Sequence, residues 1–174
     1  MEDLSYPIGK YLAKPYSEEQ RQEWLLDIEL LPKALEYAIT NLDAAQLEVP
    51  YRPMGWNSRQ VVHHVADSHM NAFIRFKLGL TEDNPTIKPY DENRWANLSD
   101  VQNIPINISI TLLFALHARM HEVLKNIKVE EWTKTIVHPE NNKQMTLWYL
   151  FGMYAWHGKH HTAHINKLRE REGW

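Results

Sequence analysis

Histidines near the end of the chain are the residues whose type and spacing most clearly suggest chemistry. Four of the ten histidines in this 174-residue sequence fall within eight positions: His157, His160, His161 and His164. Residues four positions apart share a helix face, so 157 pairs with 161 and 160 pairs with 164. Because imidazole is the commonest protein ligand of transition metals, such an HxxxH pair can offer two nitrogens to one ion. The segment predicts a metal site, and partly exposed, water-bonded histidines are the alternative interpretation.

The apolar residues around these histidines predict a helix and indicate which pair faces inward. They repeat at helical spacing: Leu147, Leu150, Phe151, Tyr154, Ile165 and Leu168. Thr146 is a suitable N-cap, and no proline interrupts the run to the end of the sequence. On this helix His161 lies close to the centre of the apolar face and His157 slightly to one side. His164 lies further round and His160 nearly opposite, so we expect His157 and His161 to point into the protein.

A third metal ligand is expected from another helix, which the sequence predicts over residues 57–80. One face of it is a continuous polar stripe at positions i, i+4, i+7 and i+11: His64, Ser68, Asn71 and Arg75. A solvated surface stripe is one interpretation. Val61 and Leu78 fall on or beside the same face, however, so the stripe can instead line a polar pocket between helices. Because His64 heads this stripe, we choose it as the third ligand.

Four amphipathic segments must position these side chains. The helices are predicted at residues 17–42, 57–80, 109–127 and 146–174, and Pro32 is expected to break or kink the first of them. Two other pairs of histidines lie on these helices. We expect His63 and His69 to be surface or structural residues. The HxxxH pair of the third helix, His117 and His121, lies beside its apolar stripe and is expected to stay outside the metal site.

The connections between the helices include one long segment, residues 81–106, which contains three prolines. Connections of this length inside a compact domain are often functional. Tyr90, Asp91 and Trp95 are therefore candidates for a lid or rim, and a merely packed loop is the alternative. Residues 128–145 are expected to hold a short helical turn and a turn at the His-Pro pair, and the first 16 residues an extended arm.

The elements and the composition together predict one all-α domain over residues 1–174, an antiparallel four-helix bundle with a long connection between its second and third helices. Hydrophobic residues make up 44% and charged residues 24%, which is typical of a soluble globular protein. The net charge of -3 gives no basic footprint for nucleic acid. The absence of cysteine excludes a disulfide framework, a thiolate metal site and a nucleophilic Cys. Without a signal peptide or an 18-residue apolar run, we expect a cytoplasmic protein that does not bind membranes.

Three segments carry a family resemblance: LSYPIGKY, PYRPMGWNSRQVVHHVADSHMNAFIRFKLGLTEDNPTIKPYDE and YAWHGKHHTAHI. They resemble the DinB-like superfamily and, within it, the YfiT-type metal-dependent hydrolases that are grouped with bacillithiol S-transferases. The resemblance covers nearly the whole chain and implies a four-helix bundle in which three histidines hold one Zn²⁺ or Ni²⁺ per chain. Its ligands are the second histidine of the HH pair and both histidines of WHxxxH, which here are His64, His157 and His161. The resemblance also implies a homodimer. Gly158 and Lys159 occupy variable positions of the last motif, and neither removes a ligand.

Three neutral imidazoles leave an open position on a divalent ion, which is typical of a catalytic metal site. Our main expectation is transfer of a small thiol such as bacillithiol to an electrophile. In that reaction Arg75 pairs with a carboxylate of the thiol, and Ser68 and Asn71 orient it. The alternative is hydrolysis of an amide or ester by hydroxide generated at the metal, with Asp67 or Asp91 as the proton acceptor.

A further alternative is a non-catalytic binding protein in which the metal only clamps two helices. Such a structural site would need a fourth protein ligand, for instance His160 or His117. Two other metal chemistries are disfavoured by the sequence. Gly158 occupies the position of the glutamate in HExxH proteases. No Asp or Glu stands three residues before any histidine, as the Glu-x-x-His pairs of di-iron bundles require.

Overall fold

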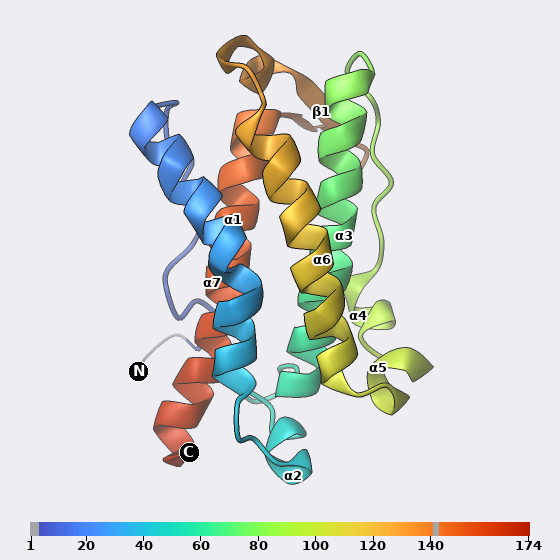
Figure 1. Cartoon of the computed structure of the whole chain (residues 1–174). Helices are drawn as coiled ribbons and strands as arrows, with labels where there is room; N and C mark the ends of the chain where they lie inside the picture. Colours follow the sequence, from blue (N-terminus) through green and yellow to red (C-terminus); the bar gives the residue numbers. More distant parts are fainter. Residues whose placement is uncertain (1–3, 141–142) are drawn as a thin grey trace.

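The structure is a computed structural model that describes residues 4–140 and 143–174. Four long helices dominate it (Figure 1): α1 (Glu18–Ile39), α3 (Ser58–Thr81), α6 (Ile106–Lys125) and α7 (Leu147–Glu172). The shorter elements are the helices α2 (Ala44–Leu47), α4 (Glu92–Trp95) and α5 (Ser99–Asn103), a 3₁₀ helix η1 (Val129–Thr133), and strands β1 (Thr135–His138) and β2 (Lys143–Thr146). The predicted four-helix bundle is confirmed. None of the helices in the described part of the chain has the length and hydropathy needed to cross a membrane.

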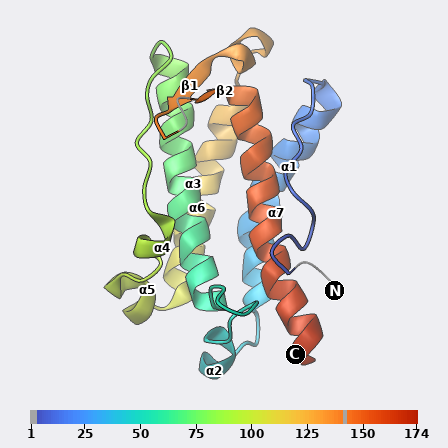
Figure 2. The same ribbon diagram turned by 180° about the vertical axis from the view of Figure 1, so that it is seen from behind.

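The long helices pack in a ring in which α1 and α3 each contact both α6 and α7. The colours of Figure 1 show that α1 and α7 run in one direction, whereas α3 and α6 run in the opposite direction. The cause is the long connection, residues 82–105, which runs along the bundle and returns the chain to the end where α3 begins (Figures 1 and 2). Helices α1 and α6 therefore pack antiparallel, as do α3 and α7. The other two neighbouring pairs, α1–α7 and α3–α6, run parallel.

Side-chain caps fix where the helices of the site begin. Asn57 accepts a hydrogen bond from the backbone N–H of Gln60, and the Gln60 side chain accepts one from the Asn57 N–H, which completes a capping box at the start of α3. Thr146 caps α7 by accepting a hydrogen bond from the N–H of Tyr149, as its position predicts. These caps set the register in which the histidines of α3 and α7 face each other.

A break or a kink was predicted at Pro32, and the break is wrong. The helix continues from Glu18 to Ile39. Proline lacks the N–H that would bond to the carbonyl four residues earlier, here that of Ile28. The Ile28 carbonyl instead accepts a hydrogen bond of 2.6 Å from Nδ1 of His117 on α6. Packing against α6 therefore replaces the hydrogen bond that the helix itself cannot form.

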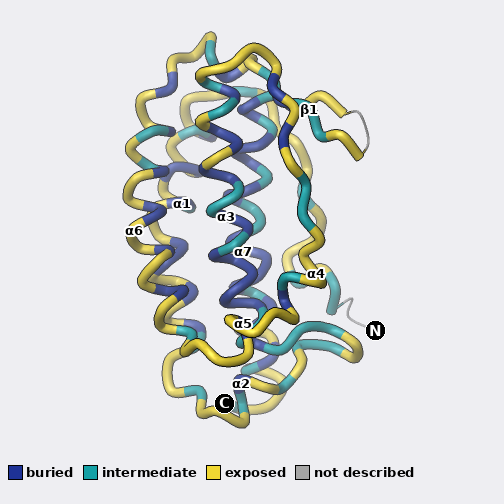
Figure 3. The backbone as a smooth tube through the Cα atoms, turned by 90° about the vertical axis from the view of Figure 1, so that its right-hand side faces the viewer, coloured by how far each residue is buried: buried dark blue, intermediate teal, exposed yellow. Residues whose placement is uncertain are grey.

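The buried core consists of two apolar clusters at different levels of the bundle. One includes Trp24, Phe76, Trp132, Leu150 and Phe151, and the other includes Leu35, Val61, Val65, Leu113 and Ile165. On α3 and α7 the segments between the two clusters contain buried histidines, among them His69, His161 and His164. Figure 3 shows the buried faces of the long helices turned toward one another and their exposed faces turned outward. A layer of imidazoles thus separates two apolar layers.

A short hairpin in the last connection was not predicted from the sequence. β1 pairs antiparallel with β2, with Thr135 opposite Thr146 and His138 opposite Lys143. The long connection attaches to the same hairpin, because Ile87 donates its N–H to the Val137 carbonyl over 3.0 Å. The hairpin therefore anchors one end of the connection that passes beside the candidate site.

Candidate metal centre

Three histidines from α3 and α7 come together between these two helices. His64, His157 and His161 each offer a ring nitrogen, and these three atoms lie within 4.8 Å of one another. Nε2 of His64 lies 3.3 Å from Nε2 of His157. The ring centroids of His157 and His161 are 4.5 Å apart, as expected for residues one helical turn apart. These are the three residues that the sequence indicates as ligands.

The donor atoms and their protonation suit a divalent metal ion. Two nitrogens bound to one tetrahedral ion at about 2.0–2.1 Å lie about 3.3 Å apart, which matches the separation of the Nε2 atoms of His64 and His157. Nδ1 of His161 is buried without a hydrogen-bond partner among the described residues, so no protein group holds that ring away from the cluster. Burial lowers the pKa of His64 to about 4 and holds the pKa values of His157 and His161 well below the usual range. All three rings are therefore neutral near pH 7, the state in which imidazole binds metals.

No fourth protein ligand joins this cluster within residues 4–140 and 143–174. His160 is engaged elsewhere, because its Nε2 lies 3.0 Å from Nε2 of His164. His117 bonds to the Ile28 carbonyl and to His69. Neither of the two residues considered for closing a structural site therefore does so, and this arrangement favours a centre that is open to a ligand.

His160 and His164 are buried, although the helical wheel places them away from the apolar face. The reason is that other segments cover this side of α7. Tyr51, from the loop before α3, stacks on His164 with ring centroids 3.8 Å apart. Within α7 itself, Trp156 stacks on His160 at 4.4 Å. Tyr6 from the N-terminal arm also contacts His160, at 5.9 Å between ring centroids. A helix pattern does not reveal such coverage by distant segments.

A cleft of about 430 Å³ opens onto the three histidines. Aromatic side chains form much of its wall, including Tyr51, Trp56 and Trp156. Trp56 packs against His64, with ring centroids 4.5 Å apart. Glu92, from the first turn of α4, also lines the cleft. A small molecule that enters the cleft is therefore surrounded by residues that include the three histidines and one glutamate.

A second cleft, of about 420 Å³, adjoins the first and shares His157 and Glu92 with it. Ser68, Arg75, Tyr90 and Asp91 are among its lining residues. Arg75 is buried, and its Nη1 donates a hydrogen bond of 2.8 Å to the Tyr154 hydroxyl. In the described part of the chain no carboxylate forms an ion pair with Arg75, and its Nε has no partner. This guanidinium is therefore available to an anionic group in the second cleft.

The remaining predicted site residues divide between the clefts and the helix surface. Ser68, Arg75 and Asp91 line the second cleft, while Asn71 and Asp67 line neither. Asn71 donates its side-chain N–H to the Asp67 carbonyl within its own helix. Burial, with a smaller contribution from Asp100, raises the pKa of the Asp67 carboxyl to about 6. Only part of the polar stripe therefore faces the second cleft: Ser68 and Arg75 line it, whereas Asn71 does not.

Glu92 was not singled out in the sequence, yet it lines both clefts. Desolvation raises the pKa of its carboxyl, and the charge of Asp91 raises it further. Its neighbour Asp91 caps α4 by accepting a hydrogen bond from the N–H of Arg94. The Asp-Glu-Asn run in the long connection was a signal for this capped turn, but only the fold places Glu92 in the wall of the clefts that the histidines also line.

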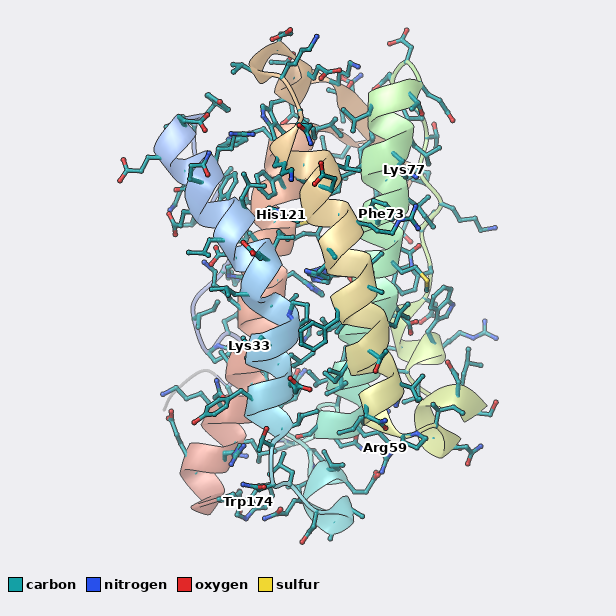
Figure 4. All side chains as sticks on the ribbon, viewed as in Figure 1. Lys33, Arg59, Phe73, Lys77, His121 and Trp174 are labelled. Carbon is teal, nitrogen blue, oxygen red and sulfur yellow. The ribbon has the colours of Figure 1, made fainter. Side chains whose placement is uncertain are left out.

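Two buried histidines lie beside the centre, and the sequence did not reveal the contacts that they make. His69 and His117 have exposed fractions of only 0% and 2%, so they are structural residues with polar ring atoms that need partners. His121, one turn after His117, also lies toward α1 (Figure 4) but is only partly buried, with its Nε2 3.9 Å from the Glu29 carboxylate. The two members of the HxxxH pair on α6 therefore have different environments.

Comparison with known proteins adds four findings. The family model of the DinB superfamily matches residues 27–165. A Bacillus cereus (strain B4264) protein named a "putative metal-dependent hydrolase" is 51% identical over 175 residues, covering 100% of both chains. A Bacillus anthracis (strain CDC 684) protein with the same description is also 51% identical over 175 residues and 100% of both chains. YfiT from Bacillus subtilis, described as "a probable metal-dependent hydrolase with an unusual four-helix bundle topology", matches with a TM-score of 0.96 and 43% identity over 99% of each chain.

Proposed function

This chain belongs to the DinB superfamily. From that premise we propose that it is a metal-dependent hydrolase in which His64, His157 and His161 hold one Zn²⁺ or Ni²⁺. The observation that carries the proposal is the meeting of three neutral imidazoles at a cleft, with no fourth protein ligand among the described residues. Three nitrogen ligands and an open position are the pattern of catalytic rather than structural metal sites. Imidazole ligands suit both metals.

The metal ion, when bound, acts as a Lewis acid and lowers the pKa of coordinated water to about 7, which makes a nucleophile available at neutral pH. The chain's own residues supply the remaining functions. Trp56 and Trp156 form an apolar wall of the first cleft, which excludes bulk water from part of a bound ester or amide. Glu92 accepts a proton in the same cleft, since its raised pKa brings its basicity closer to neutral pH.

Arg75 supports a substrate that carries a negative charge. Its guanidinium lies in the second cleft, next to the shared residue His157. A carboxylate placed there forms charge-assisted hydrogen bonds with Arg75, while the scissile bond extends into the first cleft. The two clefts together therefore favour an anionic amide or ester over a neutral one.

A second candidate function, transfer of a small thiol to an electrophile, is favoured by the same arginine. The chain contains no cysteine, so a sulfur nucleophile has to arrive on a cosubstrate. A thiol with a carboxylate, such as bacillithiol, can pair with Arg75 and extend its sulfur past His157 toward the centre. This candidate requires both clefts to be occupied at once, by the thiol and by the electrophile.

The two functions are separated by assaying the Zn²⁺-loaded and the Ni²⁺-loaded protein with one panel of activated esters, amides and alkyl halides, with and without bacillithiol. A hydrolase cleaves members of the panel without thiol, loses this activity after chelation and regains it when metal returns. We expect that result, with faster cleavage of substrates that carry a carboxylate. Turnover that requires the thiol would instead establish the transferase, and hydrolysis that survives chelation would contradict a metal-dependent mechanism.

A further inference from the structure

A continuous line of hydrogen-bonded imidazoles leads from the candidate metal centre across the bundle. Nδ1 of His157 lies 3.3 Å from Nε2 of His69, and Nδ1 of His69 lies 3.1 Å from Nε2 of His117. Nδ1 of His117 lies 2.6 Å from the carbonyl oxygen of Ile28. The line passes from α7 through α3 and α6 to α1, so all four long helices contribute to it.

The carbonyl at the end of the line determines where every proton lies. A carbonyl oxygen only accepts, so Nδ1 of His117 carries a hydrogen and donates it to Ile28. A neutral imidazole has one N–H, which leaves Nε2 of His117 as the acceptor for Nδ1–H of His69. Nε2 of His69 then accepts from Nδ1–H of His157. The Nε2 atom of His157, which faces His64, is consequently left with a free lone pair.

Pro32 explains why the Ile28 carbonyl is available as the anchor. In an uninterrupted helix this carbonyl would accept the N–H of residue 32, but proline has no N–H. His117 takes the vacated acceptor position at a short distance, in an environment where its ring is only 2% exposed. Burial also lowers the pKa of His117 to about 4, so the ring is neutral when it makes this bond.

We propose that His69 and His117 are positioning residues that fix the tautomer and ring orientation of His157. The Ile28 carbonyl fixes the tautomer of His117, and each ring fixes that of the next, so that the Nε2 lone pair of His157 is free to bind the metal. The inference deepens the proposed function and depends on His157 being a metal ligand. Metal-bound histidines commonly donate their second N–H to an oxygen acceptor, and this partner sets the orientation of the ligand. Here a histidine takes that role, and a second histidine and a backbone carbonyl fix it in turn.

The protonation pattern can be measured directly on the metal-free and the Zn²⁺-loaded wild-type protein labelled with ¹⁵N-histidine. Two-bond ¹H–¹⁵N correlation spectra distinguish a ring protonated at Nδ1 from one protonated at Nε2. We expect His117, His69 and His157 to carry their protons at Nδ1 in both forms. A proton at Nε2 of His69 or His157 would overturn the proposed line of hydrogen-bonded imidazoles. Because this measurement requires no substrate, its result is independent of whether the protein proves to be a hydrolase.

Metal affinity provides the second measurement, by competition with a chromogenic chelator at pH 7. His69→Leu removes the acceptor for Nδ1–H of His157 and should weaken Zn²⁺ binding by roughly 10–100-fold, the usual effect of losing such a partner. His69→Gln retains a side-chain oxygen as an acceptor and should restore most of the affinity. Equal losses in the leucine and glutamine variants would overturn the positioning role.

The matched control is His63→Leu. His63 is a buried histidine on the same helix, and its Nδ1 bonds to Ser109 Oγ over 2.8 Å. It is not part of the line of hydrogen-bonded imidazoles. This variant should bind Zn²⁺ nearly as tightly as the wild type. Thermal unfolding of each variant shows whether it is folded, and the spectra of the wild type test the proposal even if His69→Leu does not fold. If the wild type binds no metal but shows the expected protons, the proposed function fails while the tautomer assignment stands.

Discussion

The candidate metal centre depends on imidazoles that stay neutral because they are removed from water. His64 has an exposed fraction of 4% and packs against the indole of Trp56. Desolvation disfavours the imidazolium form, so burial is the largest cause of the lowered pKa of this ring. A buried neutral ring keeps its lone pair for a metal over a wider pH range than an exposed histidine does. The nitrogen atoms of a buried imidazole, however, must either form hydrogen bonds or bind a ligand in the folded protein.

Adjacent histidines on α3 allow the role of the centre to be tested one residue at a time. His64→Ala removes a nitrogen from the cluster, and we expect it to abolish stoichiometric Zn²⁺ or Ni²⁺ binding and hydrolysis. His63→Ala removes the neighbouring ring, which bonds to Ser109 instead, and should retain the metal. Metal content of the purified variants by elemental analysis is the measurement. Retention of metal by His64→Ala, or its loss from both variants, would argue against the three-histidine centre.

Sequence spacing predicts which histidines meet, but not everything that surrounds them. The choice of His64, His157 and His161 followed from one rule, helical spacing. His157 and His161 lie on the apolar side of their helix, and His64 heads the polar stripe of its own helix. Their ligation of a metal stays a prediction. Glu92 lay beyond the reach of this rule, since a loop residue has no periodicity to indicate its direction. The burial of His160 likewise depends on the distant arm that carries Tyr6.

Helix α1 shows how a tertiary contact overrides a local signal. Proline in a helix interior costs about 3 kcal/mol relative to alanine, which is why the sequence predicts a break or a kink at Pro32. One part of that cost is the unpaired carbonyl of Ile28, and His117 satisfies it from α6. The same contact gives α6 a fixed rotation about its axis. Helix continuity and the orientation of His117 are therefore two consequences of one hydrogen bond.

A double-mutant cycle tests this coupling between α1 and α6. His117→Leu in the wild-type background leaves the buried Ile28 carbonyl unpaired, which should cost about 1–3 kcal/mol beyond the change in packing. In a Pro32→Ala background the new N–H at position 32 can bond to the same carbonyl. The leucine substitution should then cost at least about 1 kcal/mol less. Urea unfolding of the metal-free variants gives the four free energies, and a coupling energy near zero would contradict the arrangement.

At the scale of the whole molecule, the path of one connection decides the topology. Four amphipathic helices are enough to predict a bundle, but their directions depend on residues 82–105, which cross the length of the molecule (Figure 2). This path is fixed in part by pairing between Ile87 and Val137, which are 50 positions apart. The strands of the hairpin have four residues each, which is too short for alternation to reveal them. Contacts between distant segments thus account for the part of the fold that local patterns did not predict.

The imidazole layer between two apolar clusters should make the stability of the metal-free protein sensitive to mild acid. Burial lowers the pKa values of His64, His117 and His160 to about 4 and that of His164 to about 3, whereas histidines in the unfolded chain titrate near 6.5. Between these values the unfolded chain binds more protons than the folded protein, so stability falls as the pH decreases. Asp67, Asp27 and Glu92 act in the opposite direction, because their raised pKa values favour the folded state when they are protonated. The histidines outnumber these carboxyl groups.

We therefore expect the free energy of unfolding of the metal-free protein, measured in urea, to decrease between pH 7 and pH 5. His117 alone should contribute about 2 kcal/mol of this decrease, given its pKa of about 4 and an unfolded value near 6.5. His117→Gln cannot titrate, so its unfolding free energy should fall less steeply over the same range, whatever its stability at pH 7. The same pH dependence in both proteins would show that this ring is not held neutral by the fold. Bound metal should raise the unfolding free energy across this range without reducing the decrease, because it keeps the ligands unprotonated in the folded form and leaves proton binding by the unfolded chain unchanged.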